Sequence, residues 1–152
     1  MEVEPARILL VEDEPLNIEL LQLALNNYNF VNQIDFLEDG EQALHYLLGR
    51  EGNPPTAPLP DLVLLDLRLP KINGLQVLQQ LRNHPQTQDL AVIVLVAAPE
   101  EYDRNGLSAL GVNSYLVKPL DFERLIHAIR RVGFYWMLLK RSPLAPPSNL
   151  SL

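Results

Sequence analysis

The sequence predicts an α/β domain built on a doubly wound parallel sheet of five strands, and three observations support this class. Short aliphatic runs of strand length alternate five times with segments of helical apolar spacing. Unbroken runs such as residues 62–65 are typical of strands buried on both faces, as in parallel sheets. The 152 residues are 47% hydrophobic and 20% charged, which suits one domain with a full core.

The strands are expected where the aliphatic runs lie. They cover residues 7–11, 33–37, 61–66, 90–96 and 112–117. The second is the shortest, and the fourth is solidly aliphatic. The third follows a Gly/Pro-rich loop over residues 50–60, which is longer than most connections in compact domains. Because right-handed crossovers place the intervening helices on both faces, the sheet should be covered on either side.

The helices are expected between and after these strands. They cover residues 15–28, 40–48, 74–83, 99–110 and 120–131. Pro15 suits the first position of the first helix. The third follows a turn signal, Asn73-Gly74. The fourth is the weakest, because it is polar and contains Gly106.

Three of the expected strands end in charged residues. The first is followed by Glu12 and Asp13, the third ends in Asp66, and the fifth is followed by Lys118. Doubly wound sheets place ligands outside the carboxyl ends of their strands. In the flavodoxin-like strand order the first and third strands are neighbours, so the three carboxylates would meet in one crevice, with Lys118 on the same edge.

This set of side chains favours phosphoryl chemistry. Clustered carboxylates repel one another, and a hard divalent cation relieves the repulsion. Mg²⁺ prefers a few carboxylates together with water and phosphate, and a lysine suits a phosphate as a point charge. An Asp is then a plausible nucleophile. The alternative is an acidic strand-end cluster in which Lys118 is only an ion-pair partner.

Three segments resemble the receiver domain of two-component response regulators. They are Ile8-Leu9-Leu10-Val11-Glu12-Asp13-Glu14, Leu64-Leu65-Asp66-Leu67-Arg68-Leu69-Pro70 with Gly74, and Tyr115-Leu116-Val117-Lys118-Pro119. The likeness covers roughly residues 6–132, in the right order and spacing. A narrower likeness is to the small cyanobacterial regulators that partner phytochrome histidine kinases. It rests on the loop at 50–60, the turn Leu69-Pro70-Lys71, and the aromatic stretch 134–136 followed by prolines.

The resemblance implies a stand-alone response regulator whose Asp66 accepts a phosphoryl group from a sensor histidine kinase, of the phytochrome type in the narrower likeness. It implies a Mg²⁺ site formed by Asp13, Asp66 and the backbone carbonyl of Arg68. Glu12 would act on the ion through water. Such a protein is a signalling phospho-acceptor rather than an enzyme, with at most Mg²⁺-dependent phosphorylation and dephosphorylation of itself.

The resemblance also assigns roles at the fifth strand. Lys118 would pair with the phosphoryl oxygens, and the bond from Lys118 to Pro119 would be cis. Tyr115 would be the switch aromatic whose rotamer reports the phosphorylation state, and the alternative is an ordinary half-buried strand aromatic. The Arg68 side chain has two readings, one leaning over the site and one as a solvated loop arginine.

The chain departs from the family at Val96. Receivers end the fourth strand with a Thr or Ser that bonds the phosphoryl group, and Val96 takes that place without a hydrogen-bond donor. Losing a charge-assisted hydrogen bond would cost about 1.5–3 kcal/mol. Two functions therefore stay open, a phospho-acceptor with an altered readout and a pseudo-receiver that acts as a constitutive dimeric interaction module. A small phosphatase with Asp66 as nucleophile is a third, weaker option.

Charge and composition exclude several classes of function. The formal net charge is −7, which argues against binding to nucleic acid or to an anionic membrane through the overall field. With no cysteine, disulfides and thiolate chemistry are absent. The acidic N-terminal lead is unlike a signal peptide, and no apolar run is long enough to span a bilayer. We expect a cytoplasmic protein.

The last expected helix continues into an apolar stretch. Residues 1–132 would form the receiver domain, and 133–152 a helix extension with a Pro-rich tail. The extension is apolar all round, which predicts an interface. Its residues are Phe134, Tyr135, Trp136, Met137, Leu138 and Leu139. A two-fold homodimer is the favoured reading, and a tail that covers its own domain is the alternative. The 20 residues after 132 are too few for an output domain, so output would be protein–protein contact.

Overall fold

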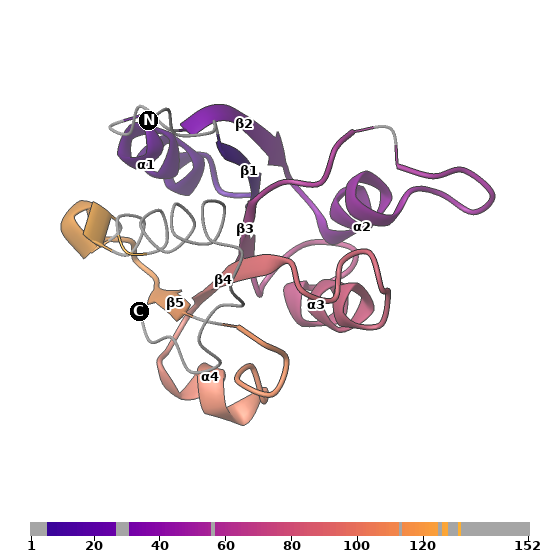
Figure 1. Ribbon diagram of the computed structural model, residues 1–152. Coiled ribbons are helices and arrows are strands. Elements are labelled where there is room, and N and C mark those ends of the chain that lie inside the picture. The colour runs from indigo at the N-terminus through magenta and orange to yellow at the C-terminus, as the bar shows by residue number, and fades with distance from the viewer. Residues whose placement is uncertain are drawn as a thin grey trace.

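The computed structural model describes residues 6–26, 31–55, 57–112, 114–124, 126–127 and 131. They form a five-stranded sheet with helices on both faces (Figure 1). The strands are β1 (Ala6–Val11), β2 (Val31–Leu37), β3 (Leu62–Asp66), β4 (Ala91–Val96) and β5 (Ser114–Val117). Their order is β2-β1-β3-β4-β5, and every neighbouring pair is parallel. The predicted doubly wound, flavodoxin-like class is confirmed.

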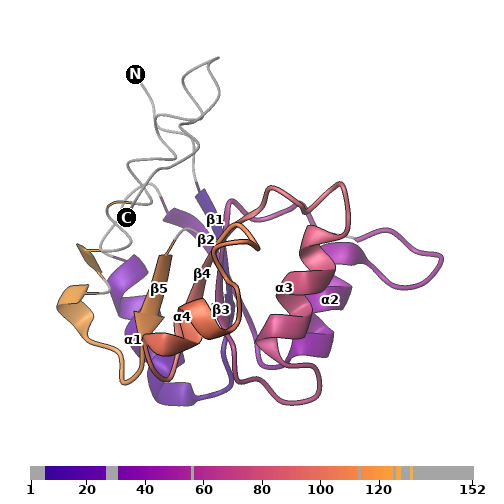
Figure 2. The same ribbon diagram turned by 90° about the horizontal axis from the view of Figure 1, so that it is seen from below.

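The helices divide between the two faces of the sheet. They are α1 (Pro15–Leu25), α2 (Gly40–Leu48), α3 (Gly74–Arg82) and α4 (Glu100–Arg104). Figures 1 and 2 both show α1 on one side of the sheet and α2 with α3 on the other. Residues 122–124, 126–127 and 131 are also helical, and Ile126 packs against the core on the α1 side.

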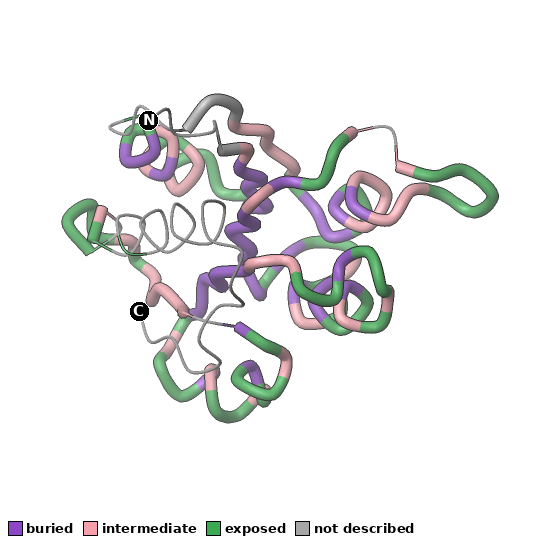
Figure 3. Tube along the Cα trace, viewed as in Figure 1, coloured by how far each residue is buried: buried purple, intermediate pink, exposed green. Residues whose placement is uncertain are grey.

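Alternate residues of the strands fill two apolar layers. Side chains along a strand point to opposite faces, so near-continuous aliphatic runs supply both layers at once. The layer under α2 and α3 contains Leu9, Val11, Ala43, Leu47, Val63, Leu65, Val77, Leu78, Leu81, Val92, Val94 and Val96. The layer under α1 contains Ile8, Leu10, Leu21, Ala24, Leu25, Leu62, Leu64, Ile93 and Leu95. Figure 3 shows the resulting band of buried residues along the sheet.

Local sequence signals fix where the helices begin. Pro15 occupies the first position of α1. The side chain of Asp39 caps α2 by accepting a hydrogen bond from the backbone N–H of Gln42 at 2.8 Å. Asn73 and Gln76 form a reciprocal capping box at α3. The Asn73-Gly74 turn signal thus marks the start of this helix.

The fourth helix is shorter than expected. The sequence predicts helix over 99–110, whereas α4 ends at Arg104 and turns follow. Gly106 has a φ of 64°, in the left-handed region that a right-handed helix cannot continue through. The buried side chain of Leu107 instead anchors the turn to the layer under α2 and α3.

The expected helix extension and its interface residues lie outside the described residues, so the tail interface stays a prediction. The first helix is shorter than the expected span to about residue 28, because α1 ends at Leu25 and Asn26 is its C-cap. Among the helices that the structure describes, none has the length and apolarity needed to cross a membrane.

Candidate functional site

The register of the sheet brings the charged strand ends to one edge. Val11 of β1 pairs with Leu65 of β3, one residue before the carboxylate at the end of β3. Val96 of β4 pairs with Val117 of β5, and the backbone N–H of Lys118 donates to the carbonyl of Val96 at 2.8 Å. The acids after β1, the acid ending β3 and the lysine after β5 therefore share one edge.

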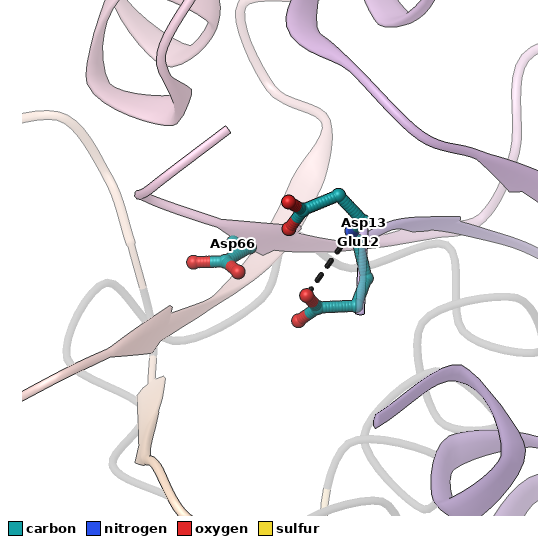
Figure 4. Close-up of side chains that lie close together, drawn as sticks. All are labelled: Glu12, Asp13 and Asp66. Atoms are coloured by element: carbon teal, nitrogen blue, oxygen red, sulfur yellow. Dashed lines mark hydrogen bonds between the residues drawn. The ribbon is translucent and has the colours of Figure 1, made fainter. Parts of the chain in front are cut away.

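Three carboxylates converge at that edge. Glu12, Asp13 and Asp66 each offer an oxygen that lies within 4.8 Å of the other two. Figure 4 shows the three side chains approaching one another from the ends of β1 and β3. Glu12 and Asp66 are each 1% exposed, whereas Asp13 is exposed. The cluster is thus buried on one side and open to solvent through Asp13.

Glu12 is the carboxylate with unmet bonding capacity. Its Oε1 accepts hydrogen bonds from the backbone N–H groups of Asp13 and Glu14, both at 3.1 Å. Its Oε2 is buried and has no hydrogen-bond partner among the described residues. Burial, and then the negative charge of Asp66, raises the pKa of Glu12 to about 8. A cation bound here would satisfy the orphaned oxygen and favour the ionised acid, so the donor set fits Mg²⁺.

Asp66 is held by positive and donor groups on its other side. The Nζ of Lys118 lies 3.0 Å from Oδ1 and 2.9 Å from Oδ2 of Asp66. The backbone N–H of Arg68 also donates to Oδ1 at 2.9 Å. The Lys118 side chain is 20% exposed, so solvent reaches the lysine side of the ion pair. The bond between Lys118 and Pro119 is cis.

The last residue of β4 contributes no polar side chain. Val96 is fully buried within the apolar layer under α2 and α3. Tyr115 on β5 is half-buried, and its ring centroid lies 4.9 Å from that of Tyr102 on α4. The hydroxyl of Tyr102 donates to the carbonyl of Val112 at 2.9 Å. Tyr115 is thus packed against α4.

The Arg68 side chain is not simply solvated, because it forms an ion pair. It is 69% exposed, yet its Nη2 donates to Oε1 of Glu101 at 3.1 Å. The Glu101 side chain is 8% exposed and lies in the first turn of α4. Sequence reasoning missed Glu101. The sequence offered only a weak signal for this residue, because Glu101 is one of three acids in this short helix.

Residues 8–130 match the model of the response regulator receiver domain. The chain belongs to this family. The receiver is 39% identical, over 140 residues, to the probable methanogenesis regulatory protein FilR2 of Methanothrix harundinacea, covering 92% of this chain and 89% of that one. Membership identifies a signalling domain rather than a metabolic enzyme.

Solved structures of phytochrome response regulators are also similar to this receiver. The phosphorylated cyanobacterial phytochrome response regulator RcpA is 31% identical, with a TM-score of 0.73, covering 95% of this chain and 99% of that one. The Mn²⁺-bound form of response regulator Rcp1 is 30% identical, with a TM-score of 0.68, covering 95% of this chain and 100% of that one. Both the broad resemblance and its narrower form are confirmed.

Proposed function

We propose that this receiver is a phospho-acceptor in which Asp66 takes a phosphoryl group from a sensor histidine kinase and signals through protein–protein contact. The proposal rests on the surroundings of the Asp66 carboxylate. Its carboxylate is buried, bonded by Lys118 on both oxygens, and adjacent to Glu12 and Asp13. A carboxylate that served only as an ion-pair partner would not need two further acids beside it.

The reaction is a transfer between two side chains. A carboxylate oxygen of Asp66 forms a bond to phosphorus while the bond from phosphorus to the kinase's histidine nitrogen breaks. The electron pair of the broken bond leaves with the imidazole, and Asp66 becomes an acyl phosphate. Lys118, already in contact with both oxygens, moves to the phosphoryl oxygens and offsets their charge.

The acidic cluster is proposed as a Mg²⁺ site. Asp13, Asp66 and the backbone carbonyl of Arg68 would be the direct ligands, and Glu12 would act through water. When bound, the ion would neutralise charge shared by the carboxylates and the phosphoryl oxygens. The orphaned Oε2 of Glu12 supports a cation at this point. The Mn²⁺-bound form of the similar protein Rcp1 supports it as well.

The kinase is proposed to be of the phytochrome type, on the similarity to RcpA. The similarity to FilR2, which carries a different functional name, is the reason to test this directly. Transfer from a phosphorylated phytochrome kinase should be compared with transfer from an unrelated histidine kinase. Transfer at equal rates from both would contradict the specific pairing.

Intact mass measurement tests the acceptor role. Incubation with acetyl phosphate and Mg²⁺ should give a single phosphoryl adduct, which chelation of the metal abolishes. Asp66→Asn should give none, and Asp103→Asn, an exposed acid on α4, should label like the original protein. A folded protein that forms no adduct, or an adduct that persists in Asp66→Asn, would contradict the proposal.

The second candidate function is a constitutive interaction module, and Val96 is the observation that favours it. The apolar end of β4 removes the hydroxyl through which the family senses the phosphoryl group. In that case the folded protein forms no adduct, and its association with partners is the same with and without acetyl phosphate.

Self-association through residues 134–139 is proposed on the sequence of that stretch. Sedimentation at several protein concentrations, with and without acetyl phosphate, measures both the dimer and its dependence on phosphorylation. Trp136→Ser should shift the equilibrium toward the monomer. A dimer of unchanged strength in this variant would place the interface elsewhere.

A further inference from the structure

Glu101 is a buried acid with one cationic partner among the described residues. Its side chain is 8% exposed, and Arg68 supplies that partner through a contact of 3.1 Å. A buried carboxylate without a partner is costly, so the first turn of α4 depends on this ion pair to remain packed against the sheet. The pair joins two segments, the loop after β3 and the helix after β4.

Arg68 also touches the proposed phosphorylation site. Its backbone N–H donates to Oδ1 of Asp66 at 2.9 Å, while its guanidinium extends to Glu101. A group added to Asp66 would therefore lie beside the Arg68 backbone, where a reoriented Arg68 side chain could reach it. Because that side chain is 69% exposed, it can reorient without repacking the core.

A phosphoryl group on Asp66 would compete with Glu101 for Arg68. It carries about two negative charges, which Lys118 and a bound Mg²⁺ would offset in part, and three acceptor oxygens, whereas Glu101 offers a single charge. Guanidinium groups bind phosphate oxygens in a bidentate geometry, which favours the phosphoryl group further. This competition needs no hydroxyl at Val96, because the group that changes partners is the Arg68 side chain in the loop after β3.

The helix at the other end of the pair is lightly held. α4 has five residues and no side-chain cap at its first turn. Besides Glu101, the described contacts that tie it to the domain include the Tyr102 ring against Tyr115 and the Tyr102 hydroxyl on Val112. Elements with few buried contacts open at low free energy, so losing one ion pair is a sizeable change for α4.

We propose that Arg68 is a positioning residue that exchanges partners, pairing with Glu101 when Asp66 is free and with the phosphoryl oxygens when Asp66 is modified. The exchange leaves Glu101 unpaired, and the first turn of α4 moves to hydrate it. The phosphorylation state thereby reaches α4 without a hydroxyl at the end of β4. This inference rests on the phosphorylation of Asp66 proposed above.

Hydrogen–deuterium exchange over residues 97–107, with and without acetyl phosphate and Mg²⁺, tests the exchange of partners. Intact mass is recorded on the same samples to establish the adduct. The original protein should exchange severalfold faster in this segment when phosphorylated. Arg68→Met should exchange fast in both states, and Arg104→Met, an exposed arginine on the same helix, should respond like the original protein.

The charge swap Arg68→Glu with Glu101→Arg separates a switch from a static ion pair. The swapped pair would slow exchange in the unmodified protein, but a glutamate at 68 cannot bind phosphoryl oxygens, so the response to phosphorylation should be lost. Arg68→Lys keeps the positive charge and should retain part of the response. This single substitution also gives a readout if the double variant fails to fold.

The outcomes are distinguishable. A labelled original protein whose exchange over 97–107 does not change, or an Arg68→Met protein that labels and responds like the original, overturns the inference and leaves the acceptor role standing. A folded original protein that forms no adduct overturns the acceptor role, and the inference with it.

Discussion

Two neighbouring strands end at the same edge of the sheet with opposite chemistry. β3 ends in Asp66, whose carboxylate is bonded by Lys118 and by the backbone of Arg68. β4 ends in Val96, which is buried among apolar side chains and offers no hydrogen bond from its side chain. The two strand ends are neighbours in the sheet, because Asp66 of β3 pairs with Leu95 of β4.

The difference indicates that the chemistry of the acceptor and its transmission to the helices are separable. Everything that the proposed transfer needs comes from the ends of β1, β3 and β5. The family resemblance implies a hydroxyl at the end of β4 that bonds the phosphoryl group and transmits the phosphorylation state. Val96 has no such donor. The Arg68–Glu101 ion pair supplies a different connection, from the β3 loop to the helix after β4.

Labelling should respond most strongly to loss of Lys118, the lysine after β5 that contacts the carboxylate at the end of β3. Lys118→Met leaves Asp66 buried beside two acids without its cation, so labelling by acetyl phosphate should slow roughly 100-fold. The loss of one partner from a buried pair should also lower the free energy of unfolding by about 3 kcal/mol. Labelling kinetics and urea unfolding measure the two effects.

Lys71→Met is the matched control for this change. Lys71 is an exposed lysine that pairs with Asp39 and Glu41 at 3.6 and 3.7 Å, away from the acceptor. It should label at the original rate and lose less than about 1 kcal/mol of stability. Equal slowing in the two variants would show that overall charge, rather than the contact with Asp66, controls labelling.

A smaller effect on labelling is expected from Gly74→Ala, at the point where α3 approaches the end of β3. A Cβ on Gly74 would lie 2.2 Å from the carbonyl oxygen of Asp66 and 2.6 Å from the Cα of Leu67. Gly74→Ala should therefore push α3 away from the strand, lower the free energy of unfolding by about 3 kcal/mol and slow labelling only through the displaced loop. Urea unfolding and labelling kinetics on the same protein check this.

Gly106→Ala provides the comparison on the β4 side of the molecule. Its added Cβ would meet no atom within 4 Å, so the cost is the left-handed φ of 64° alone, about 1 kcal/mol. Labelling should not change. If both glycine variants lose the same stability, close packing of α3 against β3 is not what holds the acceptor loop in place.

Much of the acceptor edge of the sheet is encoded locally in the sequence. A buried aliphatic run that stops at Asp66, and two further runs that end in acids or a lysine, were enough to predict the sheet and the convergence of the three carboxylates. General rules of strand order and crossover handedness then placed them at one edge. These features are encoded by residues close to one another in the sequence or by the topology.

The contacts that sequence reasoning missed depend on distant side chains. Nothing periodic distinguishes Glu101 from the other acids of α4, and its burial follows from how a five-residue helix sits on the sheet. The early end of α4 depends on Gly106 adopting a positive φ, which the sequence permits without requiring. The pairing with Arg68 follows only once both placements are known.

Adding a hydroxyl at Val96 should change stability less than either Lys118→Met or Gly74→Ala. Val96→Thr adds a hydroxyl to a fully buried site without a waiting partner, so the unmodified protein should lose about 1–2 kcal/mol of stability. If the end of β4 faces the phosphoryl group, phosphorylation gives this hydroxyl an acceptor. The variant should then lose less stability in the phosphorylated state than in the unmodified state. Urea unfolding with and without acetyl phosphate and Mg²⁺ measures the difference between the two states.

Val94→Thr is the control, because Val94 lies two residues earlier in β4 and is buried in the same apolar layer. Its added hydroxyl is two residues farther from the strand end. It should therefore lower the free energy of unfolding by the same amount in the unmodified and the phosphorylated protein. A loss at Val96→Thr that phosphorylation does not reduce would mean that the β4 end does not contact the phosphoryl group. Any transmission to α4 would then depend on the loop after β3, where Arg68 makes the contact with Glu101.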